Sequence, residues 1–335
     1  MDQVSVRIAD NTDVSEARRA SLRLARDLDF EGAAEGNLAI VVTELARNVL
    51  LHGGGGEIVL QPTKDPVLPA WVDVIALDRG PGIADVSKAL KDGYSSAGTP
   101  GTGLGAVRRL AATLDLYTRA GEGAALLARV TSGEMERAQK LQTTGSVCIP
   151  VAGETRCGDA WEHQDQSGRR LIIVADGLGH GAAASDAAQE ALAAFRANLH
   201  KSPREILEIA HGSLQKTRGA AVSVAEIDFE RQVVRYSGVG NISAVIVANG
   251  KSRSLVSHNG IVGHASEKIR EFNFPWHEDA FLIMHSDGLT TRWSLDRYQG
   301  LQLKPPSLIA AVLYRDFKRT RDDATIVVTR EAGAA

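Results

Sequence analysis

Three polar side chains at helical spacing stand out in the first third of the chain. In the stretch TELARNVLLH, Glu44, Asn48 and His52 occupy positions i, i+4 and i+8, so a helix places them along one stripe. Apolar residues fill the neighbouring faces, which a sheet would cover. The stripe therefore faces a ligand or water, and a solvated face is the simpler interpretation of a Glu/Asn pair that stands alone. The run GGGG that follows ends the helix and lets the chain turn into a strand.

Two later segments contain groups suited to a nucleotide. The first, LDRGPGI, places Asp78 at the end of an apolar strand, where its carboxylate can accept a hydrogen bond from an exocyclic amine. Its glycines, Gly80 and Gly82, let the backbone approach a ring closely. The second, GTPGTGLGAVRRL, has glycines from Gly101 to Gly105 just before a helix, whose free N–H groups and positive end suit phosphate. Each motif by itself could be an ordinary pair of turns.

Acidic residues at strand ends characterise the second half of the chain. Two apolar strands run directly into Asp-Gly, a pair of acids precedes a third strand, and a further acid stands near the start of this half. The set comprises Asp159, Asp176 with Gly177, Asp287, Asp322 and Asp323. Any single member is best explained as a turn residue. Together they predict a Mg²⁺ or Mn²⁺ site, because carboxylates and carbonyls are hard ligands, and two ions about 4 Å apart can activate a water against a phosphate.

Composition indicates a folded protein of the cytoplasm. The chain has 335 residues, of which 44% are hydrophobic and 24% charged, as expected for two domains of moderate size. No apolar run approaches the roughly 20 residues that span a bilayer, and the first residues lack the basic and apolar regions of a secretory signal. The two cysteines, Cys148 and Cys157, are not at metal-ligand spacing. We therefore expect a protein of a reducing compartment, without a membrane partner.

The charge pattern argues against nucleic acid as a partner. The net charge is −3, whereas nucleic-acid binding needs a face rich in Lys and Arg. The most basic segment, RDFKRTRDD at Arg315–Asp323, has mixed sign and is typical of a solvated helix end. We therefore expect a protein or a small molecule as the partner.

Two domains are needed to position these residues. Residues 1–131 are predicted to form an α/β unit, residues 132–146 a polar linker, and residues 147–335 a strand-rich α+β unit with helices laid on its sheets. In the first unit, we expect Asp13 to be the N-cap of a helix that precedes the polar stripe, and a helix over 106–115 to precede a closing hairpin. The helices predicted in the second unit span residues 182–198, 203–216 and 307–319.

The order of the polar stripe and the two glycine motifs resembles the GHKL (Bergerat-type) ATP-binding fold of histidine kinases, gyrases and anti-sigma factors. The resemblance covers nearly all of residues 1–131 and implies an α/β sandwich that binds Mg-ATP. By motif, Asn48 would hold Mg²⁺ on the phosphates, Asp78 would read adenine, and Glu44 would be the general base that activates the attacking hydroxyl. The other ATP contacts would come from Gly80, Gly82 and a lid formed by Gly101, Thr102, Gly103, Leu104 and Gly105.

Within this fold, the chain is most similar to the small switch kinases. A histidine kinase needs a phosphoacceptor histidine upstream, and no histidine precedes His52. The phrase TELARNVLLHGGGGEI resembles the RsbT-like kinases of stressosome pathways, which phosphorylate a serine on a STAS-domain partner, whereas RsbW-like anti-sigma kinases usually differ after the asparagine. His52 fits a helix end near the C-terminal dipole at least as well as a catalytic role.

The second half resembles the PPM metal-dependent serine/threonine phosphatases, in the short SpoIIE/RsbX-like branch. The landmarks GD, ADGLGHG, SDGL and DDAT occur in order between about Val147 and Arg330, and the Gly-Asn turn of YSGVGNISAVIV fits near the site. The resemblance implies an α-β-β-α sandwich with two Mn²⁺ or Mg²⁺ ions. By position, the ligands would be Asp176 bridging both ions, the Gly177 carbonyl, Asp159 on one ion, and Asp287 and Asp322 on the other, with Asp323 the less favoured of the adjacent pair. Arg156 is a candidate for holding the phosphate by its proximity alone, and His180 either contacts the substrate or caps the following helix.

Two complete motif sets in one chain predict a bifunctional enzyme of partner switching in stress response or sigma-factor regulation. The first domain would phosphorylate a serine or threonine on a STAS-domain partner, and the second would remove phosphate from that partner or a relative. An alternative is a nucleotide-gated module that captures a regulator without phosphotransfer. Glu44 discriminates between the two, because a pure binder needs no base. A further alternative is that ATP orders the loop at 79–105 and so regulates the attached phosphatase.

Overall fold

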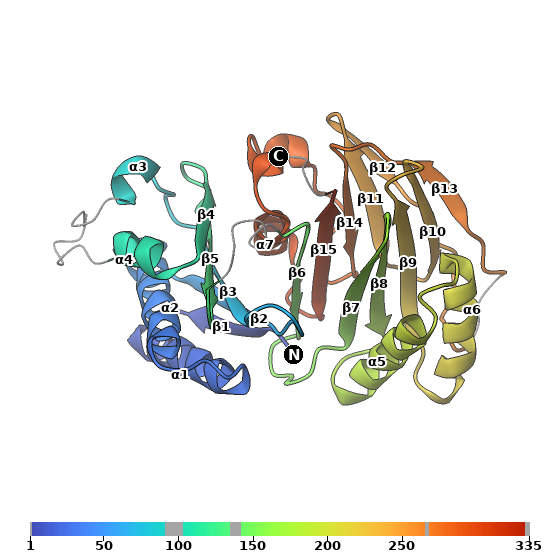
Figure 1. The fold of residues 1–335 in the computed structure, drawn as a ribbon, viewed down its shortest axis with the longest axis horizontal. Helices are drawn as coiled ribbons and strands as arrows, with labels where there is room; N and C mark the ends of the chain where they lie inside the picture. The colour runs from blue at the N-terminus through green and yellow to red at the C-terminus, as the bar shows by residue number, and fades with distance from the viewer. Residues whose placement is uncertain (1, 91–102, 135–141, 265–267, 332–335) are drawn as a thin grey trace. The chain divides into compact units, whose positions relative to one another are not determined.

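The chain folds as two compact units, described here from a computed structural model that covers residues 2–90, 103–134, 142–264 and 268–331 (Figure 1). The first unit comprises Met1–Gln142 together with Ser307–Arg315, and the second comprises Thr143–Pro306 and Asp316–Ala335. Across the described ranges, none of the helices combines the length and the apolar composition needed to cross a bilayer.

An antiparallel five-stranded sheet forms the base of the first unit, in the order β1-β2-β3-β5-β4. Helices α1, α2 and α4 lie on one face of this sheet (Figure 1). The elements in chain order are β1 (Val4–Ile8), α1 (Asn11–Asp27), α2 (Ala33–Leu51), β2 (Gly56–Thr63), β3 (Trp71–Asp78), α3 (Val86–Ala89), α4 (Gly103–Leu110), β4 (Thr113–Thr118) and β5 (Ala124–Thr131).

Two predicted helix boundaries in this unit are wrong. The N-cap of α1 is Asp10, whose side chain accepts hydrogen bonds from the N–H groups of Thr12 and Asp13. Asp13 is instead the N3 residue that bonds back to the cap, so the sequence contains a capping box that begins three residues earlier than expected. Helix α4 ends at Leu110 because β4 already begins at Thr113, where pairing with β5 overrides the helical propensity of the Ala-rich segment.

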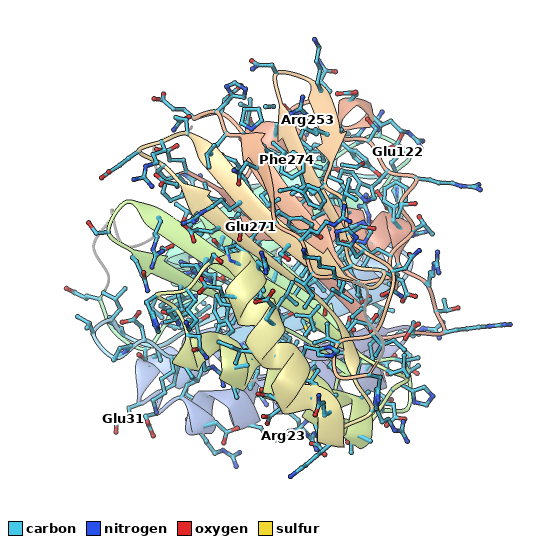
Figure 2. All side chains as sticks on the ribbon, turned by 90° about the vertical axis from the view of Figure 1, so that its right-hand side faces the viewer. Arg23, Glu31, Glu122, Arg253, Glu271 and Phe274 are labelled. Carbon is cyan, nitrogen blue, oxygen red and sulfur yellow. The ribbon has the colours of Figure 1, made fainter. Side chains whose placement is uncertain are left out.

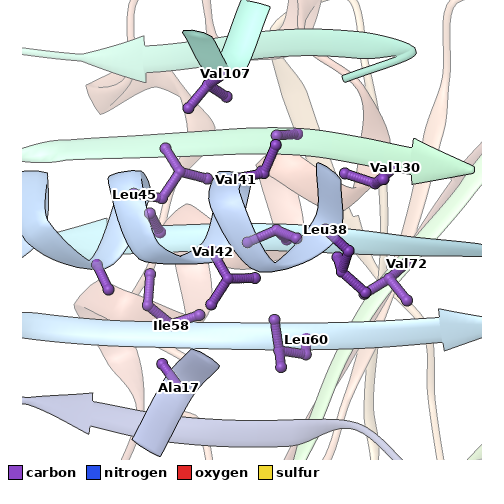
Figure 3. Packing of buried hydrophobic residues seen from close by; sticks show 14 of the residues in the cluster. Ala17, Leu38, Val41, Val42, Leu45, Ile58, Leu60, Val72, Val107 and Val130 are labelled. Atoms are coloured by element: carbon purple, nitrogen blue, oxygen red, sulfur yellow. The ribbon is translucent and has the colours of Figure 1, made fainter. Parts of the chain in front are cut away.

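Apolar packing between α2 and the sheet holds this unit together. Figure 3 shows one face of α2 lying against side chains from several strands. Leu38, Val41, Val42 and Leu45 on this face are all 0% exposed. Burying each such side chain contributes about 1.5–3 kcal/mol. Because this face packs against the sheet, the polar stripe lies on the remaining face of α2.

A buried ion pair crosses the same sheet. Asp73 on β3 lies directly opposite Arg129 on β5, and the guanidinium donates Nε and Nη2 hydrogen bonds to the two carboxylate oxygens, each at 2.7 Å. The two side chains are only 3% and 2% exposed. The guanidinium also lies over the ring of Trp71, at 4.8 Å from its centroid. Such a fully paired bidentate arrangement is the form in which a protein tolerates two buried charges.

Two five-stranded sheets form the second unit, in the orders β13-β10-β9-β8-β7 and β12-β11-β14-β15-β6. They pack face to face through a shared apolar core, and α5 and α6 cover the outer face of the first sheet (Figure 1). The strands are β6 (Thr144–Ile149), β7 (Asp159–Gln166), β8 (Arg169–Gly177), β9 (Ala220–Asp228), β10 (Val233–Val239), β11 (Ser243–Ala248), β12 (Lys251–Ser254), β13 (Phe272–Pro275), β14 (Phe281–His285) and β15 (Ala324–Arg330). The helices are α5 (Ala182–Ala197), α6 (Pro203–Ser213) and α7 (Pro306–Phe317), the last counted mostly with the first unit.

The two-domain fold predicted from the sequence is therefore present, with its layers built as expected. The strand β6 begins at Thr144, inside the range predicted as a linker, and residues 135–141 of that linker lie outside the described residues. The closing hairpin of the first unit is also confirmed, since β4 and β5 pair antiparallel from Thr113 to Thr118. These elements bring each group of candidate residues to one end of its own unit.

Candidate functional site

The polar stripe of α2 contains a buried side-chain amide, that of Asn48. The side-chain Nδ2 of Asn48 is buried, and it has no hydrogen-bond partner among the described residues. An unsatisfied buried donor costs about 1–3 kcal/mol, so such a group in a folded protein calls for an explanation. Glu44, one turn earlier, is mostly covered, with 16% of its side chain exposed, and its Oε1 lies 3.5 Å from Arg47 Nη1. The two side chains thus lie one turn apart on the face of α2 that does not pack on the sheet.

The start of α4 lies close to this amide. A Cβ added to Gly103 would lie 3.8 Å from Asn48 Oδ1. The first residue of α4 therefore faces the amide group of α2, and the helix carries its free N–H groups at that end. Of the predicted lid, Gly103, Leu104 and Gly105 belong to α4, whereas Gly101 and Thr102 lie outside the described residues.

Asp78 ends β3 as predicted, and one of its two carboxylate oxygens is hydrogen-bonded within the protein. The residue is 8% exposed, and Oδ1 accepts hydrogen bonds from the N–H groups of Gly80 at 2.9 Å and Ala124 at 3.2 Å. Within the described part of the chain, Oδ2 has no hydrogen-bond partner. The carboxylate is therefore held in place through one oxygen and can accept from a ligand through the other.

Glycines allow three backbone segments to meet around Asp78. A Cβ on Gly53, just after α2, would lie 2.4 Å from the Asp78 Cβ, and a Cβ on Gly80 would lie 2.8 Å from the Gly53 Cα. Gly82 has φ +77°, and a Cβ on this residue would collide with the carbonyl oxygen of Arg119. The glycines after α2 and in the LDRGPGI segment are thus required for close packing of the helix end on this loop.

Two other residues near these segments, His52 and Thr118, form hydrogen bonds within the unit. His52 is the exposed C-cap of α2, and its backbone N–H donates to the Asn48 carbonyl at 2.9 Å. Thr118, which the sequence did not single out, accepts from the Ile83 N–H at 2.9 Å and donates to the Gly123 carbonyl at 3.1 Å. These two bonds join the LDRGPGI segment to the β4–β5 hairpin. No local pattern identifies it, because its partners are brought to it by the sheet.

Strand pairing in the second unit gathers the predicted acids at one edge. Asp159 opens β7 and lies directly opposite Asp176 near the end of β8. On the other sheet, β14 and β15 are neighbours, so Asp287, two residues after β14, lies near Asp322, which precedes β15. The register of two separate strand pairs therefore places four acids from distant parts of the sequence at one end of the sandwich.

The acids are close enough to alter one another's ionisation. Burial, and then the negative charges of Asp159 and Asp287, raise the pKa of Asp176 to about 9. Burial also raises the pKa of Asp159 to about 7, although Ser286 donates to it. Burial and the charge of Asp287 raise the pKa of Asp322. Crowded carboxylates of one sign favour protonation or a bound cation, since either removes their repulsion.

The described side chains do not form a complete set of ligands around one metal ion. Across residues 2–90, 103–134, 142–264 and 268–331, no group of three or more His, Cys, Asp or Glu side chains has the geometry to hold a metal ion. The fit of this site to divalent cations is therefore electrostatic: oxygen donors of like charge converge at a buried edge. Gly177 supports close packing there, because a Cβ on it would lie 2.0 Å from the Ala184 carbonyl oxygen.

Asp323 is arranged differently from its neighbour. It is 2% exposed, Oδ1 accepts from the Val151 N–H at 2.7 Å, and Oδ2 accepts from the Gly158 N–H at 2.9 Å. Both of its oxygens therefore hold the loop that leads to Asp159. A Cβ on Gly158 would come within 2.5 Å of that carboxylate, which explains the glycine.

Two neutral side chains orient the remaining acids. Ser286 Oγ donates to Asp159 Oδ2 at 2.6 Å and accepts from the Thr325 N–H at 3.0 Å. Asn241 Nδ2 donates to Asp287 Oδ2 at 2.8 Å. The Gly-Asn turn therefore does lie at the acids, as the sequence indicated. Ser286 was missed, although its position directly before an Asp-Gly pair was a usable signal.

Neither substrate-contact candidate is free. Arg156 Nη2 donates to Asp186 Oδ1 at 2.8 Å, in an exposed ion pair. His180 Nδ1 lies 2.7 Å from Glu154 Oε1, and α5 begins without a side-chain cap. The structure therefore gives both residues protein partners.

Comparison with known proteins identifies both units. The family model described as histidine kinase-like ATPase domain matches residues 8–130, and that described as stage II sporulation protein E (SpoIIE) matches residues 166–331. Serine/threonine-protein kinase RsbT of Bacillus subtilis (strain 168) is 37% identical over 122 residues, which cover 36% of this chain and 91% of RsbT. Phosphoserine phosphatase RsbX of the same organism is 25% identical over 138 residues, covering 41% of this chain and 69% of RsbX.

Solved structures support the fold. A chain from a structure reported as "The bacterial stressosome: a modular system that has been adapted to control secondary messenger signaling" is 24% identical with a TM-score of 0.54, covering 56% of this chain and 98% of that one. RsbX in complex with magnesium is 22% identical with a TM-score of 0.51, covering 55% of this chain and 92% of that one. The chain thus belongs to the RsbT family through its N-terminal histidine kinase-like ATPase domain, and it carries a SpoIIE-type phosphatase domain after it.

Proposed function

We propose that this chain is a bifunctional enzyme of a partner-switching pathway. Its first unit transfers phosphate from Mg-ATP to a serine or threonine of a STAS-domain protein, and its second unit removes phosphate from a phosphoserine or phosphothreonine protein with the help of Mn²⁺ or Mg²⁺. The observation that carries the proposal is the presence in one chain of two features: a buried Asn48 Nδ2 without a hydrogen-bond partner among the described residues, and a separate edge of crowded acids. The similarity to a named kinase and a named phosphatase supports the same pairing.

In the kinase unit, each role follows from position. Asn48 would hold the Mg²⁺ of Mg-ATP through Oδ1, which faces the start of α4. Asp78 would accept from the adenine amine through Oδ2, while its bonds to Gly80 and Ala124 keep the carboxylate aligned. Mg²⁺ would offset the charge on the triphosphate. Glu44 would accept the proton of the attacking hydroxyl, one turn from Asn48.

In the phosphatase unit, four acids and one carbonyl would hold the metal ions. They are Asp159, Asp176, Asp287, Asp322 and the carbonyl of Gly177. A divalent ion would supply the opposite charge that the crowded carboxylates lack and would activate a water against the phosphate. Ser286 and Asn241 would keep Asp159 and Asp287 oriented. We assign Asp323 to positioning the loop before Asp159, because both of its oxygens already accept from backbone N–H groups.

The two activities can be tested separately in the full chain. With radiolabelled ATP and a purified STAS-domain protein, Asn48→Ala should abolish label transfer, whereas Glu35→Gln, in the first turn of the same helix, should not. With a phosphorylated STAS-domain protein and Mn²⁺, Asp176→Asn should abolish phosphate release. Wild-type rates for both variants in their own reactions would refute the assignment.

A nucleotide-gated binding module is the second candidate for the first unit. It is favoured by the position of Arg47, whose Nη1 lies 3.5 Å from Glu44 Oε1 and competes for the carboxylate that a kinase needs as a base. Glu44→Gln decides between the two. A kinase loses phosphotransfer while it still binds ATP, whereas a binding module retains both ATP affinity and partner capture.

A further inference from the structure

An arginine that the sequence did not single out lies beside the loop after Asp176. The Leu178 N–H donates to the Gly219 carbonyl at 3.0 Å, which joins that loop to the turn before β9. A Cβ added to Gly179 would lie 3.3 Å from Nη1 of Arg218. The guanidinium of Arg218 therefore lies against the segment that directly follows the proposed bridging carboxylate.

The backbone that carries Arg218 is anchored on both sides. Gly177 pairs with Ala220 across β8 and β9, so the strand register sets the distance between the turn and the loop. On the other side, Thr217 Oγ1 accepts from the Gly219 N–H at 3.0 Å and donates to the Leu214 carbonyl at 2.8 Å. Arg218 therefore belongs to a turn whose backbone is held in place on both sides.

Arg218 has no ion-pair partner among the residues that the structure describes. Its side chain is exposed, and no hydrogen bond to it is found within the described ranges. Arg156, the arginine suggested by its place in the sequence, is instead bound to Asp186 at 2.8 Å. A guanidinium that lies beside the loop after Asp176, without a partner among the described residues, is available to an anion that the site receives from solution.

We propose that Arg218 binds the phosphate group of the phosphoprotein substrate; the assignment rests on the proposed phosphatase function of the second unit. A guanidinium suits this task because its planar fork donates two parallel hydrogen bonds to phosphate oxygens. Metal ions held by the acids would contact one side of the phosphate. Arg218, over the adjacent loop, would hold the oxygens that remain.

Kinetics of the full chain with p-nitrophenyl phosphate and Mn²⁺ test this role. Because a charge-assisted hydrogen bond contributes about 1.5–3 kcal/mol, Arg218→Ala should lower kcat/KM about tenfold or more, mainly through a higher KM. The inhibition constant of inorganic phosphate should rise by a similar factor. Arg218→Lys should recover part of the loss, since lysine keeps the charge but not the fork. The Mn²⁺ concentration for half-maximal rate should stay unchanged, because Arg218 touches no proposed metal ligand side chain.

Arg253→Ala is the matched control. Arg253 is also exposed, and it lies on the edge strand β12, two strands away from β14 (Figure 2). Equal constants for Arg218→Ala and Arg253→Ala would overturn the assignment. A loss of Mn²⁺ affinity or of melting temperature in Arg218→Ala would also overturn it, since the residue would then hold the loop. Absence of metal-dependent hydrolysis in the wild type would instead refute the proposed phosphatase function, and this inference with it.

Discussion

Replacing Asp323 with asparagine should destabilise the second unit through the loop before Asp159. Asp323 accepts from the N–H groups of Val151 and Gly158 at 2.7 and 2.9 Å, at 2% exposure. Asparagine keeps one acceptor oxygen but presents an NH₂ donor to the second N–H group. One charge-assisted bond is lost, and a buried donor is left unsatisfied, which costs about 2–3 kcal/mol.

The melting temperature of the full chain measures this cost. For a unit of this size, 1 kcal/mol shifts the midpoint by about 2–4 °C, so Asp323→Asn should melt about 4–12 °C below the wild type. Circular dichroism or calorimetry in a chelator separates this effect from metal binding. The loss of one negative charge near Asp159 works in the opposite direction, since it relieves repulsion among the acids.

Asp322→Asn is the control for that charge effect. Asp322 also lies among the acids, but the backbone bond that its carboxylate accepts, from the Asp323 N–H at 3.0 Å, is one that an amide oxygen can replace. We expect it to melt at or above the wild-type temperature while losing metal-dependent phosphatase activity. If the two variants melt at the same temperature, the different roles assigned to the adjacent acids are incorrect.

Three further predictions concern other parts of the chain. Gly177→Ala should abolish phosphatase activity and lower the melting temperature, because its Cβ would lie 2.0 Å from the Ala184 carbonyl oxygen. Arg129→Met should cost about 3–5 kcal/mol in urea unfolding of the first unit, since it leaves the Asp73 carboxylate buried and unpaired. The stability of the chelator-treated protein should fall as pH rises from 4 to 9, because the raised pKa of Asp176 makes the folded state bind more protons than the unfolded state, and Mn²⁺ should reverse that fall.

Each of these predictions has a matched comparison. Gly212→Ala tests the glycine argument, because a Cβ there meets nothing within 4 Å, and wild-type behaviour is expected. The double variant Asp73→Leu with Arg129→Met should recover much of the stability lost by the single change. For the pH profile, Asp176→Asn should flatten the decline between pH 4 and 9. A steep decline that persists in this variant would contradict the link to the acids.

Much of the fold follows from local patterns in the sequence. Apolar runs that end in acids or glycines identified the strands that lead to each site, and helical spacing identified α2 with its polar stripe. One error was local: the cap of α1 was placed at Asp13, which is the N3 residue of a capping box that begins at Asp10. The other occurred where a local signal competes with strand pairing: the helix before β4 was predicted to continue to Asp115, because the energy of the β4–β5 ladder is not visible in the segment itself.

The candidate sites show a similar division between what could and could not be predicted. The acids could be named in advance, because they directly precede, begin or follow strands and occur in the order of a known motif set. The different role of each acid could not be predicted in this way. Asp322 and Asp323 are adjacent and chemically identical, and they differ because Asp323 accepts from the N–H groups of Val151 and Gly158, the latter 165 residues away in the sequence. Arg218 was overlooked for the same reason: its neighbour Gly179 is reached only through the β8–β9 register.

The sequence by itself therefore determined the domain order, the family resemblance and the residue types that each site offers. These depend on spacing along one segment, and the chain encodes that spacing directly. Only the tertiary structure decided which donors have partners among the described residues: Arg156 has one, whereas Asn48 Nδ2 and Arg218 have none. Hydrogen bonds and burial join residues that are distant in sequence, so a side chain's role depends on contacts that no local pattern specifies.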